Sequence, residues 1–149
     1  MSRGRQTQVA SDQFLALEID ECLALLDATE VGRLAFIEGD ELTVLPVNYR
    51  LVEGAIVYRT GFGHVLDALS AGPRVAFEID GTDAQTWTGW SVLVRGRAEE
   101  VADLAELEQL RTSPPRPWAP GTKEHYVRIL PSHITGRRIT RTTDLAWHG

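Results

Sequence analysis

Hydrophobic and polar residues follow two different periods along this chain of 149 residues, and the changes of period locate its elements. From Ile19 to about Ala28, apolar residues recur at helical spacing, which predicts a helix with Asp20 as its N-cap. Short runs rich in Val, Ile, Phe and Tyr, separated by tight turns that contain glycine, are typical of strands. The expected strands are residues 31–37, 42–49, 55–59, 75–79, 86–101 and 132–141.

Three further segments have helical character. Residues 63–70 carry apolar side chains on one face, and a helix over 103–110 would begin with a capping box made by Asp103 and Glu106. One or two helical turns are expected within residues 122–130. All three segments are short, so we expect them at the rim of a fold that the strands dominate.

The order of these elements predicts one domain, residues 1–149, with a mainly β fold. Six short strands without regular strand–helix alternation favour a six-stranded antiparallel β-barrel with peripheral helices over a doubly wound sheet. Pro46 predicts an edge or a bulge in its strand, and Gly89 and Gly96 predict bulges or bends in theirs. The polar residues 1–13 are expected to be flexible.

Composition and charge narrow the classes of partner. A net charge of −6 argues against nucleic acid as the main partner, because neutralising phosphates requires a clustered positive surface. No apolar run approaches the ~20 residues that span a bilayer, and the first residues lack the apolar core of a secretory signal. We therefore expect a cytoplasmic protein without a membrane partner. The single cysteine, Cys22, is expected in the core, and the four histidines lack the spacing of a metal site.

The segment VYRTGFGHVL, residues 57–66, is the strongest candidate for chemistry. Arg59 and Thr60 end an apolar strand, and Gly61 and Gly63 precede the expected helix, whose first N–H groups could face an anion. The arrangement could hold a phosphate monoester. The alternative is a strand-to-helix connection with a solvated arginine.

Two more segments could contribute to a site. In PVNY, Pro46 followed by Val47, Asn48 and Tyr49 could leave backbone groups facing a planar heterocycle, or it could be an ordinary edge strand. Trp87 and Trp90 are three residues apart in an expected strand, so their side chains should point to opposite faces. One would pack in the core, and the other would line a cleft or a subunit interface.

The segments PVNY, IVYRTGFG, GPRVAFEID, GWSVLVRGRAEEV and ITGRRI follow one another between residues 20 and 141. In this order they resemble the pyridoxamine 5′-phosphate oxidase-like proteins, an FMN-binding split β-barrel family. The resemblance implies a six-stranded antiparallel split barrel and a homodimer with two cofactor sites at the subunit interface. It implies FMN as the cofactor, with the deazaflavin F420 as the alternative.

Matched by position, the resemblance assigns roles to individual residues. Arg59 and Thr60 match the phosphate-binding segment, and residues 47–49 match the segment that lies along the isoalloxazine ring. Trp90 and Ser91 match the strand that reaches the cofactor across the dimer.

The chain departs from the family at a second phosphate contact. Many relatives carry a lysine where this chain has Val65, so His64 would have to replace that cation once an anion raises its pKa. The residues that bind the substrate of true pyridoxamine phosphate oxidases are not visible, so that particular reaction is not predicted.

The resulting expectation is a flavin-dependent oxidoreductase that passes hydride between the flavin and a small-molecule substrate. No catalytic side chain is assigned, because the cofactor carries the chemistry. The alternatives are an F420-dependent reductase, a flavin- or haem-binding protein of the same fold without turnover, and a dimeric scaffold whose site has decayed.

Overall fold

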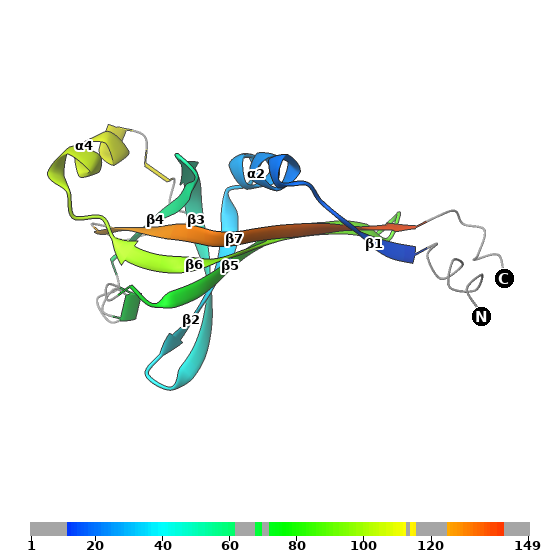
Figure 1. Cartoon of the computed structure of the whole chain (residues 1–149), viewed down its shortest axis with the longest axis horizontal. Coiled ribbons are helices and arrows are strands. Elements are labelled where there is room, and N and C mark those ends of the chain that lie inside the picture. The colour runs from blue at the N-terminus through cyan, green and yellow to red at the C-terminus, as the bar shows by residue number, and fades with distance from the viewer. Residues whose placement is uncertain (1–11, 62–67, 70–71, 113, 116–124, 142–149) are drawn as a thin grey trace.

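Six antiparallel strands form a closed ring in the structure, a computed structural model that describes residues 12–61, 68–69, 72–112, 114–115 and 125–141. Neighbouring strands follow the order β7-β4-β3-β2-β5-β6, and β6 pairs back onto β7, which closes the ring (Figure 1). The predicted six-stranded antiparallel barrel is therefore confirmed. The strands are β2 (Val31–Glu38), β3 (Glu41–Val52), β4 (Ala55–Thr60), β5 (Arg74–Asp83), β6 (Thr88–Glu100) and β7 (His125–Arg141).

A seventh strand, β1 (Asp12–Ala16), lies outside the ring and pairs with the last residues of β7. The expectation of flexibility over residues 1–13 is thus wrong at its end, because Asp12 and Gln13 belong to this strand. The cause is the length of β7. Its partner β4 covers only residues 125–129, and β1 covers part of the edge that remains. Beyond the ring, β1, the β5–β6 hairpin and the end of β7 form an extended arm (Figure 1).

Helix α2 (Ile19–Ala28) has the predicted bounds, and its buried residues Cys22 and Leu26 belong to the barrel core. Its N-cap is Glu18 rather than the predicted Asp20. The backbone N–H of Glu18 donates to the carboxylate of Glu21 at 3.1 Å, which completes a capping box. Asp20 lies in the first turn, where its charge favours the positive end of the helix dipole.

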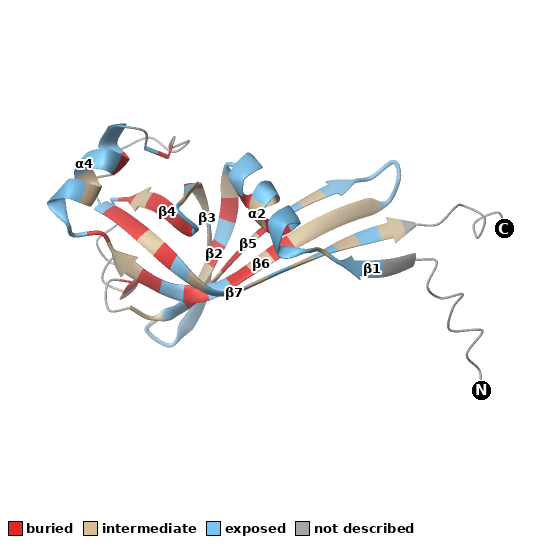
Figure 2. Cartoon of the chain, turned by 45° about the horizontal axis from the view of Figure 1, so that its top comes forward, coloured by how far each residue is buried: buried red, intermediate tan, exposed pale blue. Residues whose placement is uncertain are grey.

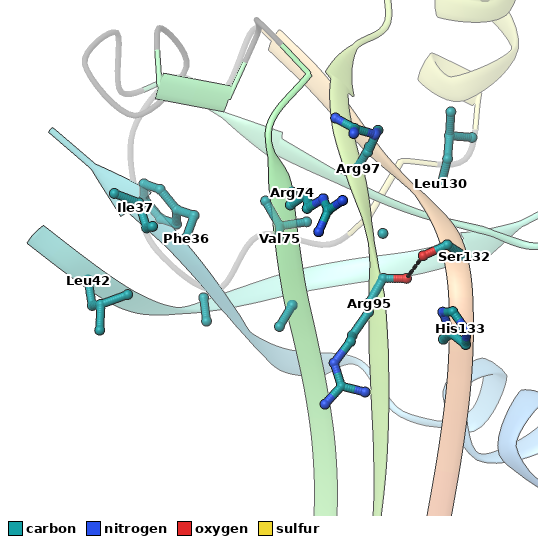
Figure 3. A pocket seen from close by; sticks show the side chains of 13 residues that line it. Phe36, Ile37, Leu42, Arg74, Val75, Arg95, Arg97, Leu130, Ser132 and His133 are labelled. Carbon is teal, nitrogen blue, oxygen red and sulfur yellow. Dashed lines mark hydrogen bonds between the residues drawn. The ribbon is translucent and has the colours of Figure 1, made fainter. Parts of the chain in front are cut away.

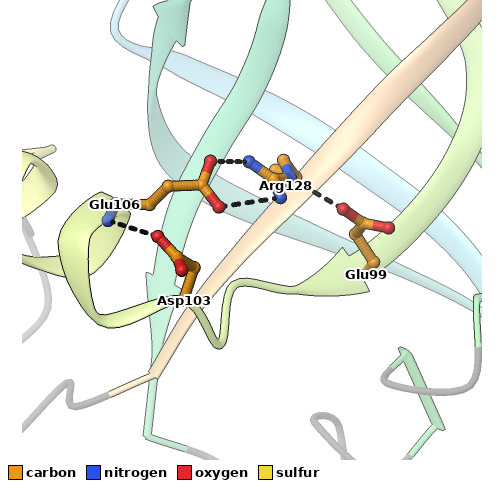
Figure 4. Close-up of polar contacts among 4 residues, drawn as sticks. All are labelled: Glu99, Asp103, Glu106 and Arg128. Carbon is orange, nitrogen blue, oxygen red and sulfur yellow. Dashed lines mark hydrogen bonds and ion pairs between the residues drawn. The ribbon is translucent and has the colours of Figure 1, made fainter.

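Helix α4 (Leu104–Thr112) begins where the sequence predicted a capping box. Asp103 accepts a hydrogen bond from the backbone N–H of Glu106 at 3.1 Å, as expected for a cap. The Glu106 carboxylate turns instead to Arg128 of β7, whose guanidinium donates to it at 2.6 and 3.2 Å and to Glu99 of β6 at 2.8 Å (Figure 4). This charge network fastens α4 to the barrel.

The prediction of helical turns within residues 122–130 is wrong from His125 onward, because β7 begins there rather than at Ser132, and residues 122–124 lie outside the described residues. Tyr126, Val127 and Ile129 are all buried, since this part of β7 packs between β4 and β6 and is covered on both faces. The apolar spacing therefore comes from a buried strand and not from a helix face. Of the predicted helix over 63–70, the structure describes residues 68–69 alone.

Two apolar clusters fill the fold, and the buried segments follow the strands of the barrel (Figure 2). The larger lies inside the ring, and the smaller joins β4 and β7 to α4. Gly96 permits the irregularity that the sequence predicted: the β6–β7 register shifts there, and a Cβ would collide with the Leu130 carbonyl oxygen. At Gly89 the ladders continue without a shift, so the structure has no bulge there. Among the described residues, no helix combines the length and apolar character needed to cross a bilayer.

Candidate functional site

Strand β4 carries Arg59 and Thr60, the predicted phosphate-binding residues, at its end. The strand is covered on both faces, by the barrel core and by the cluster under α4. Neighbouring side chains of a strand project to opposite faces, so Arg59 and Thr60 point apart. Arg59 is half-buried with its guanidinium carbon 5.7 Å from the ring centroid of Tyr126, a cation–π contact, and Thr60 is buried.

The residues that follow β4 in the sequence make up the other half of the predicted phosphate cradle. Gly63, His64 and Val65 all lie outside the described residues. Their part in anion binding, including the replacement of a lysine by His64, stays a prediction.

Strand β3 forms an edge at Pro46, as the proline predicted. Pro46 and Val47 pair with β2, whereas the ladder to β4 begins only at Tyr49. The register that pairs Tyr49 with Tyr58 places Asn48 beside Arg59 on the opposite face of the sheet. The structure therefore brings the predicted ring-binding segment next to the predicted phosphate-binding arginine.

The side chain of Tyr49 has a structural role that the sequence did not reveal. It is 3% exposed, its ring packs edge-to-face on Phe77 with centroids 4.8 Å apart, and its hydroxyl donates to the Leu26 carbonyl at 2.6 Å. This bond ties the last turn of α2 to the barrel, and burial raises the pKa of the phenol. A contact between Tyr49 and a cofactor would thus come from its backbone.

Trp90 and Ser91 lie on β6, in the arm. Trp90 lines a cavity of about 250 Å³ together with Arg138 of β7. Gly81 makes room for the indole, because a Cβ there would come within 2.6 Å of its Nε1. Trp87, expected in the same strand, instead lies in the preceding turn with φ of 57° and is exposed, so it does not pair with Trp90 across the sheet.

These two groups of predicted residues are far apart in one chain. Arg59 pairs with Tyr126 of β7, and Trp90 pairs with Arg138 of the same strand. Twelve residues of extended strand separate those partners, which corresponds to about 40 Å along β7 at ~3.3 Å per residue. This separation exceeds the length of a flavin mononucleotide, so one chain does not bring both groups onto one such ligand.

A cluster of charges beside Ser91 was not found from the sequence. Asp80 lies opposite Ser91 in the β5–β6 ladder, and Arg33 contacts both Asp80 at 3.2 Å and Glu78 at 3.5 Å. Burial, followed by the hydrogen bond and negative charge of Asp80, raises the pKa of Glu78 to about 7, although Arg33 opposes the shift. Glu78 can therefore exchange a proton near neutral pH. The sequence did contain one sign of this cluster, because side chains alternate along a strand and residues 78 and 80 therefore lie on one face.

A second cavity, of about 760 Å³, opens on the barrel beside the β2–β3 hairpin. None of the predicted cofactor residues that the structure describes lines it. No group of three or more His, Cys, Asp or Glu side chains in the described part of the chain is placed to hold a metal ion.

Comparison with known proteins agrees with this architecture. The profile of the pyridoxamine 5′-phosphate oxidase family matches residues 18–138. An uncharacterized protein of Mycobacterium tuberculosis, Rv0080, is 31% identical over 140 residues, which are 91% of each chain.

Two solved structures with substantial sequence identity share the fold. The FAD binding protein from Mycobacterium smegmatis superposes with a TM-score of 0.71 at 34% identity, over 83% of this chain and 98% of that one. A putative pyridoxamine 5′-phosphate oxidase from Corynebacterium glutamicum superposes with a TM-score of 0.75 at 36% identity, over 88% and 96% of the two chains.

Proposed function

The chain belongs to the pyridoxamine 5′-phosphate oxidase family, and we propose that it is a homodimeric flavoprotein with one flavin nucleotide in each of two sites between its subunits. In each site, the β3–β4 group of one subunit would face the arm of its partner. We further propose that the flavin serves an oxidoreductase that transfers hydride to or from a small-molecule substrate.

The proposal of a shared site rests on how far apart the predicted cofactor residues lie within one chain. Arg59 and Trp90 are matched to one cofactor, yet about 40 Å of β7 lies between the residues that pair with them. A second copy related by a two-fold axis removes this conflict, because the Trp90 that completes each site then comes from the partner. The arm gives the chain the reach for such an exchange (Figure 1).

The described residues suit a flavin phosphate and ring. Arg59 offers a cation at the end of β4, and Asn48 lies beside it on β3. The edge of β3 at Val47 is suited to backbone contacts with a planar ring, and Trp90 offers an aromatic surface at a cavity. A bound flavin would supply the hydride chemistry, while these residues would bind it, orient it and exclude water.

The choice of flavin is open to direct test. The resemblance of the sequence favours FMN, with F420 as its alternative, whereas the similar M. smegmatis protein is described as FAD binding. FMN and FAD share the riboflavin phosphate that Arg59 would hold, so FAD is a second candidate. An absorption spectrum of the purified protein, with mass spectrometry of the released small molecule, distinguishes the three. Protein that carries none of them and takes up none in titration contradicts the proposal.

Replacement of Arg59 tests the phosphate site. Loss of a charge-assisted hydrogen bond costs on the order of 1.5–3 kcal/mol, so Arg59→Ala should weaken flavin binding roughly 10- to 150-fold. The matched control is Arg111→Ala, which removes an exposed arginine from α4. If a folded Arg59→Ala variant binds flavin with parental affinity, the flavin phosphate does not bind at Arg59. A flavoprotein that shows no turnover across a broad substrate panel would instead support binding without catalysis.

A further inference from the structure

Among the described residues, none that we assign to the proposed flavin site lines the cavity of about 760 Å³ beside the β2–β3 hairpin. Its volume lies within the ~300–1,000 Å³ of typical small-molecule pockets. Figure 3 shows its two sides: Ile37 and Leu42 come from the hairpin, and Arg74, Arg97 and Arg95 come from β5 and β6 opposite.

Four basic side chains gather on one wall of this cavity. Arg74 lies directly opposite Arg97 in the β5–β6 ladder, and Arg95 is on the same face two residues before Arg97. His133 of β7 lies opposite Arg95. Like charges directly opposite each other on a sheet destabilise the fold, so folding alone does not account for this cluster.

No carboxylate in the described part of the chain pairs with these arginines. Arg97 donates a hydrogen bond of 2.9 Å to the carbonyl oxygen of Gly72. Elsewhere on the barrel the pattern differs: Arg33 bridges two carboxylates, and Arg128 does the same. In a chain with 21 acidic and 15 basic residues, the cavity thus concentrates positive charge without an internal counter-ion.

The opposite wall is apolar and exposed to water. Leu42 is 85% exposed and Ile37 is 59% exposed, and both residues line the cavity. Leu130 of β7 is 44% exposed and lies opposite Arg97, whereas Phe36 and Val75 border the cavity but are buried in the core. An apolar surface beside a cluster of cations complements a ligand with an apolar body and a negatively charged end.

We propose that this cavity binds a small-molecule anion, a carboxylate or a phosphate, that carries an apolar body. The anionic group lies against Arg74, Arg95 and Arg97, and the apolar body packs on Ile37 and Leu42. This site is separate from the proposed flavin site and would serve a substrate or an effector rather than the cofactor.

Calorimetric titration of the full chain with three naphthyl probes tests the proposal. The probes are 1-naphthoate, 1-naphthyl phosphate and the neutral 1-naphthalenemethanol, which share one ring system. At least one anion should bind saturably, once per chain, and about tenfold or more tighter than the neutral alcohol. The tighter of the two anions identifies the carboxylate or the phosphate as the natural group. Absence of saturable binding by both anions overturns the proposal.

Variants locate the binding. Arg74→Gln should weaken the anion about fivefold or more, and the control Arg111→Gln should leave its affinity unchanged. Leu42→Ser should weaken all three probes, and its high exposure spares the core. Equal affinity in Arg74→Gln overturns the proposal. The proposal is also overturned if the molecular mass of Arg74→Gln in solution differs from that of the parent, because that result assigns the arginines to a subunit interface.

The test is independent of the proposed function. Arg59→Ala should weaken flavin binding while the naphthyl anion binds as before, since Arg59 does not line this cavity. If Arg59→Ala abolishes anion binding as well, the probe occupies the flavin site and the separate cavity site is rejected. If the protein binds no flavin but still binds the anion, the flavin proposal fails while the cavity proposal holds.

Discussion

Replacement of Tyr49 by phenylalanine separates a structural role from a cofactor-binding role at this position. The substitution removes a buried hydroxyl that donates to the Leu26 carbonyl at 2.6 Å and keeps the ring that packs on Phe77. Loss of this bond leaves a carbonyl of the last helical turn without its partner, which costs about 1–2 kcal/mol. For a chain of this length, the loss corresponds to a decrease of about 4 °C in Tm.

Tyr58→Phe is the matched control, because the two tyrosines face each other across the β3–β4 ladder. Tyr58 is 2% exposed, and its buried hydroxyl has no hydrogen-bond partner among the described residues. Removing an unsatisfied buried hydroxyl should leave stability unchanged or raise it by up to about 1 kcal/mol. Thermal and urea unfolding should therefore show that Tyr49→Phe is less stable than the parent. Tyr58→Phe should be as stable as the parent or more stable.

Flavin titration of the Tyr49→Phe variant completes the assay. Its flavin affinity should equal that of the parent, since its hydroxyl is bound to α2 and its ring is in the core. A variant with parental stability and weakened flavin binding would refute the structural assignment of the Tyr49 side chain. If both substitutions destabilise the protein equally, the assignment of a stabilising hydrogen bond to Tyr49 and of none to Tyr58 is refuted.

Two charge clusters give the remaining predictions. The raised pKa of Glu78, about 7 in the fold, means that the folded state binds its proton more tightly than the unfolded state, so this residue lowers stability as pH rises from about 4.5 to 7. Glu78→Gln should therefore stabilise the protein at pH 8 by on the order of 1 kcal/mol after allowance for solvent screening, with no gain at pH 4; a pH-independent difference contradicts this. Arg128→Met removes the bonds to Glu106 and Glu99 and should increase hydrogen exchange in α4, residues 104–112, more than in the barrel. Unchanged exchange in α4 would show that the network does not hold the helix.

The barrel was predictable because its strands are short, strongly apolar and separated by turn residues. Pro46 also marked an edge correctly, since a proline lacks the donor that a second ladder needs. The errors occurred where a long-range pairing overrides the local pattern. Residues 125–130 have mixed spacing and become a strand because β4 and β6 lie on both sides of them, and β1 forms because β7 is long enough to leave an edge.

The candidate site was predictable as segments but not as geometry. Sequence position put Arg59 and Trp90 in one site, and only the register of β7 shows how far apart they are within one chain. The burial of Tyr49 depends on α2, a partner distant in sequence, so the motif that contains it gave no sign of its structural role. The cluster of Arg74, Arg95 and Arg97 arises from cross-strand pairing, which charge counting along the chain does not reveal.

Complementation between two variants tests the shared site most directly. At a flavin concentration that saturates the parent but not the weakened variants, the Arg59→Ala and Trp90→Ala homodimers should carry little flavin, because each substitution damages both sites. In a dimer that contains one chain of each kind, one site carries both substitutions and the other carries neither. Unfolding and refolding an equal mixture should therefore restore flavin to about a quarter of all sites, measured by flavin absorbance per chain. No recovery in a mixture that has formed mixed dimers would contradict a flavin site built from two subunits.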